Sequence, residues 1–425
     1  MDRATEPPPD AAPATAEPPS AATPHHHGAI LIGAFVAIAV LALAAFGIRA
    51  VEPSAPGAFY TPPSPVTADG AGTLIRSEPL ETAPAGARGW RILYRSTGAD
   101  GQPIAVSGTV FVPRGPAPTG GRDVVAWAHP TTGVASRCAP SIGAGGGASA
   151  IAGLGGLLRA GYVVAATDYP GLGTAGPHPD LVGVSEGRAV LDSARAAAHL
   201  DGTGATNRVG LWGHSQGGHA VLFAGQLAES YAPELEVVGV AAAAPATSLA
   251  ELLRRDIGGL SGNVLASMAL TSWSEVYAAQ GLTLDTVVER SSIPLVDLIA
   301  DGCIETTAQE LVDLPAAEVL QLRFLEADPW SIPPWDAVMA ENTPGAEAIG
   351  VPVLIAQGTA DTVVWPGVTA DWVEAQCATG VEIDERLYDG RTHTEIAQVA
   401  ADDARTWLGE RFARRPATST CAPAP

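Results

Sequence analysis

The segment Gly213-His214-Ser215-Gln216-Gly217 follows the apolar run Arg208–Trp212 and precedes an alanine-rich stretch from His219 to Leu227. This order predicts a strand, a sharp turn and a helix, with the serine at the turn. A serine hydroxyl is a poor nucleophile at neutral pH, and such a turn lifts it clear of the backbone to where a base can reach it. Glycines are expected on both sides because a Cβ there would collide with neighbouring backbone. The segment is typical of a nucleophile elbow.

Apolar runs of strand length recur on both sides of this elbow. Most are followed by a segment of helix length, which predicts right-handed βαβ units and a mostly parallel sheet. Earlier in the chain, two alternating stretches between Gly89 and Pro113 flank a turn and predict an antiparallel pair. The predicted fold class is therefore α/β with antiparallel strands at its start. The later strands are expected at Asp123–His129, Gly161–Thr167, Arg208–Trp212, Val237–Ala244, Val351–Gln357 and Val381–Leu387.

Between Ser248 and about Gly345 the apolar residues recur at helical spacing, without a convincing strand pattern. A helical block inside a βαβ series is expected to form a cap over the carboxyl edge of the sheet, where ligands bind in such folds. The cap would be inserted before the strand that ends at Gln357. The alternative is an ordinary surface insertion.

The composition excludes several classes of function. The 425 residues carry a formal net charge of -22, so the electrostatic attraction that dominates nucleic-acid binding would become repulsion. The chain contains no lysine, which excludes P-loop phosphate binding, Schiff-base chemistry and a serine–lysine dyad. A base for Ser215 must therefore be a histidine, an aspartate or a glutamate.

The N-terminal region contains a long uncharged segment, residues 28–48. At about 1.5 Å per residue, a helix of this length would cross a bilayer core. Residues 1–27 are rich in proline and alanine and are expected to be a disordered tail. We expect an uncleaved membrane anchor, or alternatively a signal segment with Ala42-Leu43-Ala44 as its cleavage site. The remainder would be extracytoplasmic, at the cell surface if anchored and secreted if cleaved.

Four cysteines follow this segment: Cys138, Cys303, Cys377 and Cys421. An even number in a chain that enters the membrane predicts two disulfides in an oxidising compartment. The absence of a C-x-x-C spacing argues against a structural zinc site. Three pairings are open. Joining Cys377 to Cys421 is the economical choice because it would tie down a terminus that otherwise frays, and it leaves Cys138 with Cys303.

His393 is the candidate base. Of the nine histidines, it is the one that lies downstream of Ser215 without flanking it too closely to turn back on it. We expect it in the loop after the strand Val381–Leu387, from which an imidazole can reach a hydroxyl at about 2.6 to 3.2 Å. The alternative is a surface histidine near a strand end.

Asp361 is the candidate third member. It follows the strand Val351–Gln357 and a short turn, so it should emerge at the same edge of the sheet as Ser215. Its carboxylate would hold one tautomer of the histidine and stabilise the imidazolium. Its competitors are Asp389 as runner-up, Asp371 in a predicted helix and Asp384 in a predicted strand.

Backbone N–H groups must stabilise the oxyanion that forms during attack on a carbonyl. Gln216, directly after the nucleophile, supplies the first donor. The second is expected in the loop His129-Pro130-Thr131-Thr132-Gly133. Since proline has no N–H, this donor is Thr131 or Thr132, and His129 is expected to brace the loop.

A set of motifs occurs in order along the chain: Ala128–Gly133, Cys138–Ser141, Asp168–Gly173, Gly213–Gly218, Gly358–Asp361 and Thr392-His393, with a weaker one at Glu341–Gly345. Together they resemble the secretory lipase family of α/β-hydrolases, the lipase A-like group. The resemblance covers roughly Phe59 to Cys421 and defines an expected hydrolase domain at 59–425.

The resemblance implies an α/β-hydrolase fold and hydrolysis of carboxylic esters, often acylglycerols or other lipid esters, without metal or organic cofactor. It places the triad on Ser215, Asp361 and His393, and it pairs Cys138 with Cys303 and Cys377 with Cys421. The chain departs from fungal members at His129-Pro130, and an uncleaved anchor would make it a surface enzyme. The alternatives are a serine peptidase or acyltransferase, or an inactive hydrolase-fold binding module.

Overall fold

The computed structural model describes residues 55–67, 70–304 and 315–421. The expected tail and the uncharged segment at 28–48 lie outside these residues. Within the described ranges, no helix is both long enough and apolar enough to cross a membrane.

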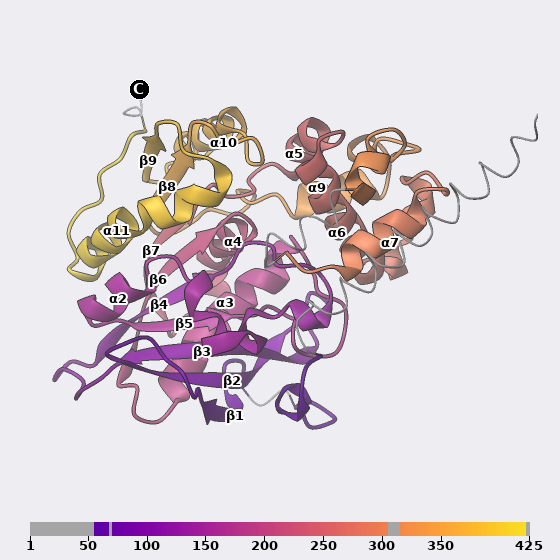
Figure 1. Ribbon diagram of the computed structural model, residues 1–425. Helices are drawn as coiled ribbons and strands as arrows, with labels where there is room; N and C mark the ends of the chain where they lie inside the picture. Colours follow the sequence, from indigo (N-terminus) through magenta and orange to yellow (C-terminus); the bar gives the residue numbers. More distant parts are fainter. Residues whose placement is uncertain (1–54, 68–69, 305–314, 422–425) are drawn as a thin grey trace, which may run out of the picture. The chain divides into compact units, whose positions relative to one another are not determined.

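A nine-stranded sheet forms the centre of the described part, in the order β1-β2-β3-β5-β4-β6-β7-β8-β9 (Figure 1). Three neighbouring pairs at the start of this order are antiparallel: β1 with β2, β2 with β3 and β3 with β5. All later neighbours are parallel. The predicted α/β class with an antiparallel start is confirmed. The strands are β1 (Leu74–Pro79), β2 (Ala87–Thr97), β3 (Pro103–Pro113), β4 (Arg122–Ala128), β5 (Val163–Thr167), β6 (Ala205–His214), β7 (Glu236–Ala243), β8 (Val353–Gly358) and β9 (Ile383–Tyr388).

The edge strand β1 is an addition that the sequence pattern does not predict. None of its residues is buried, and it ends at Pro79. An edge strand has only one neighbour and is exposed, so it lacks the apolar run or alternation by which strands are recognised in a sequence.

Helices cover both faces of the sheet. Successive side chains of a strand point to opposite faces, so Val125 and Trp127 of β4 join one buried cluster while Val124 and Ala126 join the other. Strands buried on both faces therefore read as continuous apolar runs. The first face is covered by α2 (Leu154–Ala160) and α11 (His393–Phe412), and the second by α3 (Gly183–His199), α4 (Gln216–Tyr231) and α10 (Pro366–Ala378).

The chain between β7 and β8 forms a helical insertion, immediately before the strand that leads to Asp361. Its helices are grouped together in Figure 1, apart from those that flank the sheet. None of the nine strands falls between residues 248 and 345 in the described ranges. The helices are α5 (Leu249–Asp256), α6 (Leu260–Val276), α7 (Ile293–Asp301), residues 315–320 and α9 (Trp335–Glu341).

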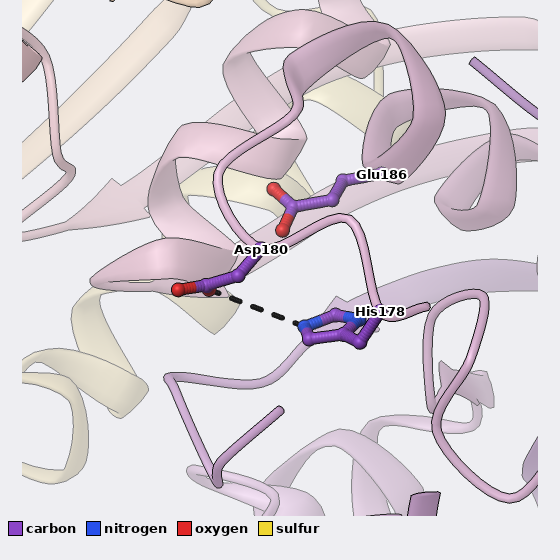
Figure 2. Close-up of side chains that lie close together, drawn as sticks. All are labelled: His178, Asp180 and Glu186. Carbon is purple, nitrogen blue, oxygen red and sulfur yellow. Dashed lines mark ion pairs between the residues drawn. The ribbon is translucent and has the colours of Figure 1, made fainter. Parts of the chain in front are cut away.

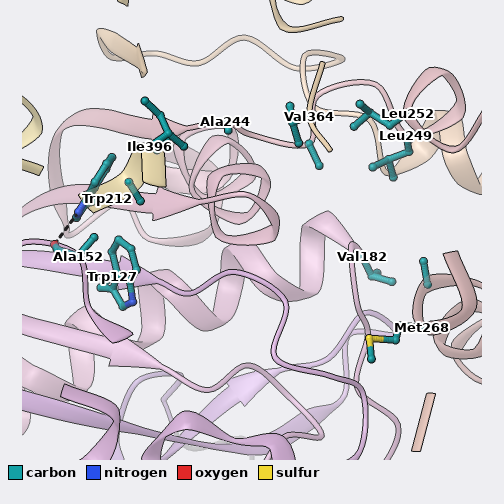
Figure 3. Close-up of a cluster of buried hydrophobic side chains, with 14 of the residues drawn as sticks. Trp127, Ala152, Val182, Trp212, Ala244, Leu249, Leu252, Met268, Val364 and Ile396 are labelled. Atoms are coloured by element: carbon teal, nitrogen blue, oxygen red, sulfur yellow. Dashed lines mark hydrogen bonds between the residues drawn. The ribbon is translucent and has the colours of Figure 1, made fainter. Parts of the chain in front are cut away.

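Buried apolar side chains join this insertion to the sheet. Trp127 and Trp212 from adjacent strands have ring centroids 5.7 Å apart, and the indole N–H of Trp212 donates to the carbonyl of Ala152 (Figure 3). Leu249 of α5 and Met268 of α6 belong to the same cluster. Since burying a large apolar side chain contributes roughly 1.5 to 3 kcal/mol, hydrophobic packing holds the insertion on the sheet.

Two disulfides link distant parts of the chain. Cys138, after β4, is bonded to Cys303, two residues beyond the end of α7, with Cα atoms 5.3 Å apart. Cys377 in α10 is bonded to Cys421 near the C-terminus, with Cα atoms 5.4 Å apart. This is the pairing that the resemblance implies, and disulfides of this kind persist in oxidising compartments.

Candidate active site

Ser215 occupies the turn between β6 and α4. Its backbone has φ 57° and ψ -117°, a left-handed conformation that costs a non-glycine residue about 1 to 3 kcal/mol. A Cβ on Gly213 would lie 2.1 Å from the carbonyl oxygen of Gly217, and one on Gly217 would lie 2.0 Å from that of Ala128. The turn therefore excludes side chains at both glycines, as expected for an elbow that presents its serine outward.

Ser215, His393 and Asp361 form a continuous chain of hydrogen bonds. Nε2 of His393 lies 2.8 Å from Oγ of Ser215, and Nδ1 lies 2.8 Å from Oδ2 of Asp361. An ionised carboxylate only accepts, so Nδ1 carries the proton and the lone pair of Nε2 faces the serine hydroxyl. The imidazole is thus oriented to take the proton of Ser215.

The carboxylate of Asp361 is itself held by the loop that follows β8. Its Oδ1 accepts hydrogen bonds from the backbone N–H groups of Val363 and Val364, at 2.9 and 2.8 Å. Its Oδ2 also accepts a long hydrogen bond from the amide of Gln357, at 3.3 Å. With the side chain buried and three donors around it, the carboxylate presents one oxygen to the imidazole in a set direction.

His393 does not lie in a loop, and that expectation is wrong. It is the first residue of α11, whose N-cap is Thr392. The side chains of Thr392 and Glu395 form a capping box, which satisfies two free N–H groups at the helix start. The T-x-x-E signal that begins this helix directly after the turn is present in the sequence. The helix start fixes the backbone from which the imidazole projects.

The two threonines after His129 have different environments. Thr131 lines the cavities around Ser215. Thr132 is buried and donates its hydroxyl to the carbonyl of Cys138. The ring of His129 lies between the carbonyls of Pro130 and Asp168, 2.7 and 3.3 Å from its two nitrogens. Both ring nitrogens of His129 therefore face backbone carbonyl groups.

Two cavities meet at Ser215, and the helical insertion lines both. The larger has a volume of about 570 Å³ and the smaller about 70 Å³. Thr131, Ser215, Leu265 and Val363 line both cavities. His393 belongs to the wall of the larger cavity and Gln216 to that of the smaller.

A buried polar cluster lies beside the elbow: His178, Asp180 and Glu186 (Figure 2). Their ligand-type atoms lie within 4.8 Å of one another, and no other such group of three occurs in the described part of the chain. The amide of Gln216 reaches Oε1 of Glu186 at 2.6 Å and Nε2 of His178 at 3.1 Å. Nδ1 of His178 donates to the carbonyl of Pro170, so Nε2 is free to accept from this amide. The side-chain amide of Gln216 thus donates to both His178 and Glu186. Through these hydrogen bonds the cluster holds the residue that follows Ser215 in the elbow.

The cluster continues toward the insertion. Oε2 of Glu186 lies 3.1 Å from Nδ1 of His219, whose Nε2 donates to the carbonyl of Asn342 at 2.8 Å. The side-chain oxygen of Asn342 accepts from the N–H of Gly183, at the start of α3. Asn342 falls in the weakest of the sequence motifs. Gln216 belongs to the elbow motif. The remaining members lie at positions that no motif or periodicity in the sequence marks: His178, Asp180, Glu186 and His219.

The protonation of Asp180 is expected to make stability depend on pH. Burial, and then the charge of Glu186, raises the pKa of Asp180 well above its ordinary value, and Oδ1 has no hydrogen-bond partner among the described residues. The folded state therefore retains a proton that the unfolded chain loses above a pH of about 4. The contribution of this proton to the stability of the folded state is complete below a pH of about 4, and it is lost as the pH rises toward the raised pKa of Asp180.

Asp180→Asn should remove this loss. Relative to the natural chain, the free energy of unfolding of the variant should rise by up to about 1 kcal/mol per pH unit from a pH of about 4 up to the raised pKa of Asp180. Urea unfolding at a series of pH values measures it. Asp371→Asn changes an exposed aspartate of α10 and is the control. If the free energy of unfolding changes equally with pH in both variants, the effect is due to net charge. If the difference between Asp180→Asn and the natural chain does not change with pH, Asp180 does not retain a proton in the folded state.

Comparisons with known proteins agree with this architecture. The sequence model of the secretory lipase family matches residues 151–420. A probable inactive lipase from Mycobacterium tuberculosis is 27% identical over 391 residues, covering 87% of this chain and 85% of that protein. Lipase A from Arthroderma benhamiae is 26% identical over 384 residues, covering 86% and 77%.

Solved structures show the same fold. Candida antarctica lipase A in its closed state has a TM-score of 0.72 at 22% identity, covering 87% of this chain and 89% of that one. The rice cell wall degrading esterase LipA from Xanthomonas oryzae has a TM-score of 0.66 at 21% identity, covering 82% and 100%. The predicted α/β-hydrolase fold is confirmed.

Proposed function

The chain belongs to the secretory lipase family, and from this premise we propose that it hydrolyses carboxylic esters of lipids through an acyl-enzyme formed on Ser215. The observation that carries the proposal is the hydrogen-bonded series from Ser215 through His393 to Asp361, at the point where two cavities meet. Acyl transfer requires a buried carboxylate, an imidazole and a hydroxyl that faces the substrate cavity, in this order.

In the proposed reaction, Oγ of Ser215 attacks the ester carbonyl carbon while Nε2 of His393 takes the hydroxyl proton. The tetrahedral intermediate collapses as the C–O bond to the alcohol breaks, and His393 returns the proton to the departing alkoxide oxygen. Water then attacks the acyl-enzyme with His393 again as base, and it releases the acid and free Ser215. Asp361 stabilises the imidazolium that forms in each half-reaction.

Two backbone N–H groups are proposed to hold the oxyanion. Gln216 is the first residue of α4, where N–H groups are free and the helix dipole favours negative charge. Thr131 is the better second donor, because it lines both cavities with Ser215, whereas Thr132 is in the lining of neither. Such a donor commonly lowers the barrier by about 3 to 4 kcal/mol.

The proposed site of action is outside the cytoplasm. Membership of a secretory family and the two disulfides support this location. Anchoring through residues 28–48, or cleavage there, stays a prediction.

One relative favours a second candidate, a binding module without activity, because it is described as a probable inactive lipase. The intact hydrogen-bonded series in this chain argues for activity. A fluorophosphonate probe separates the two, since it reacts only with an activated serine. We expect a covalent adduct on the peptide that contains Ser215, together with turnover of p-nitrophenyl butyrate. An unlabelled protein without turnover would support the binding module.

Hydrolysis is separated from peptidase and acyltransferase activity by its products. An ester substrate should yield the free acid, with slower cleavage of the matching amide and little transfer to added alcohol. Preferential amide cleavage or alcohol transfer would move the proposal to one of these reactions on the same fold.

A further inference from the structure

We propose that the smaller cavity receives the acyl group and the larger cavity the alcohol, so that the preferred substrates are short-chain acyl esters of bulky apolar alcohols. This inference rests on the proposed function and names its substrate class.

The position of His393 sets the direction in which an ester binds. Its Nε2 must return a proton to the departing alcohol oxygen, so the alcohol must lie on the side of the imidazole. His393 and Thr394 line the larger cavity. The carbonyl oxygen must point at the N–H groups of Gln216 and Thr131. The remaining substituent of the carbonyl carbon, the acyl chain, then extends away from the imidazole into the smaller cavity, whose wall includes Gln216.

The two volumes give the sizes of the groups. One water-sized group needs about 10 to 15 Å³ of cavity volume measured with a water-sized probe. The smaller cavity, at about 70 Å³, therefore holds about five or six such groups. This corresponds to acyl chains of roughly two to six carbons. The larger cavity, at about 570 Å³, accepts an alcohol of several tens of non-hydrogen atoms by the same measure.

The inner wall of the smaller cavity is buried and well packed. Trp273 and Ala269 of α6 are buried, and the indole N–H of Trp273 donates to the carbonyl of Asp180 at 2.8 Å. A longer acyl chain would have to displace this indole and break its hydrogen bond. Packed interiors resist added methylene groups, so the wall limits chain length.

The smaller cavity is also unsuited to charged acyl groups. Asp180 and Asp256 lie in its wall, and the remaining lining is mainly leucine, alanine and valine. An acyl group with a second carboxylate would lose its hydration in this cavity, and no cationic side chain among the described residues of the lining could pair with it. Neutral short acyl groups are therefore preferred over succinyl-type groups.

The lining of the larger cavity fits an apolar alcohol. Trp127, Leu260, Val264 and Ala397 contribute apolar surface, and Gln398 supplies a polar group. Apolar walls with few polar groups are typical of sites for drug-sized apolar ligands.

The test is a series of p-nitrophenyl esters from acetate to palmitate, with the alcohol held constant. We expect kcat/KM to be highest between acetate and hexanoate and to fall at least ten-fold by laurate. A rate that rises through laurate or palmitate would overturn the inference and leave the proposed function standing. If no ester in the series is cleaved and the fluorophosphonate probe does not label Ser215, the proposed function itself fails.

Substitutions in each cavity make the assignment specific. Ala269→Leu fills the smaller cavity and should lower the ratio of butyrate to acetate kcat/KM at least ten-fold. Leu253→Ala, at a partly exposed position in the same wall, should move the optimum to longer acyl chains. Should Ala269→Leu fail to fold, this variant and the ester series still decide the outcome.

The matched control lies in the other cavity. Val264→Phe narrows the larger cavity alone. It should lower the ratio of 1-naphthyl acetate to methyl acetate kcat/KM and keep the butyrate-to-acetate ratio within about two-fold. The reverse pattern, in which Val264→Phe changes the acyl preference and Ala269→Leu the alcohol preference, would overturn the assignment of the cavities.

Discussion

Replacing Ser215 by alanine is expected to lower kcat for p-nitrophenyl butyrate by about 10⁶-fold, because alanine has no oxygen to form the acyl-enzyme. A residual rate of about 10³ to 10⁴ over the reaction in water should remain, since the oxyanion donors still bind the substrate. The serine hydroxyl makes its hydrogen bond to His393 at the wall of an open cavity. Its removal should therefore change the free energy of unfolding by less than about 1 kcal/mol.

Two measurements belong together in this test. Steady-state kinetics gives the loss of kcat, and thermal unfolding shows that the fold is retained. Intact activity in Ser215→Ala would contradict the proposed nucleophile. A large fall in melting temperature would mean that the loss reports unfolding, and Ser215→Gly, which tolerates the left-handed backbone of this turn, would then replace it as the test variant.

Asp361→Asn is expected to lower kcat by about 10⁴-fold with little change in KM. Oδ2 of Asp361 accepts the proton of Nδ1 of His393. An asparagine that places its NH₂ group there would donate to Nδ1, which moves the ring proton to Nε2 and leaves no lone pair toward Ser215. The loss of activity is thus caused by the wrong tautomer of His393. The two backbone N–H groups that hold Oδ1 can still bond to the amide oxygen.

The matched control for this prediction is Asp389→Asn. Asp389 is a competing carboxylate between Ser215 and His393 in the sequence. It is exposed and accepts a hydrogen bond from Thr359 at 3.2 Å. Its substitution should leave kcat within about two-fold, because the two nitrogens of the His393 imidazole bond to Asp361 and Ser215. If Asp389→Asn were the damaging change and Asp361→Asn the harmless one, the role of orienting carboxylate would pass to Asp389.

Much of the architecture is predictable from local patterns. The elbow is predictable because the close contacts of Gly213 and Gly217 permit no side chain at either position. The motif G-x-S-x-G directly after an apolar run therefore indicates this turn. The parallel strands are predictable because burial on both faces leaves continuous apolar runs such as Val353–Gly358. Two elements show the limit of such patterns: the edge strand β1, in which no residue is buried, and the start of α11. The strand lacks the apolar run or alternation by which strands are recognised. The helix start depends on the capping pair Thr392 and Glu395, which the pattern of strands and loops does not reveal.

The sequence by itself determined the α/β class, the family resemblance, and the candidates Ser215, Asp361 and His393, because each depends on short motifs or on the order of segments along the chain. Only the tertiary structure decided which threonine lines the cavities, how Glu186, Gln216 and Asn342 are joined, and how unequal the two cavities are. These properties arise where side chains from distant segments pack together. Cavity volume is what such packing leaves unfilled, and no spacing of residues along the chain encodes it.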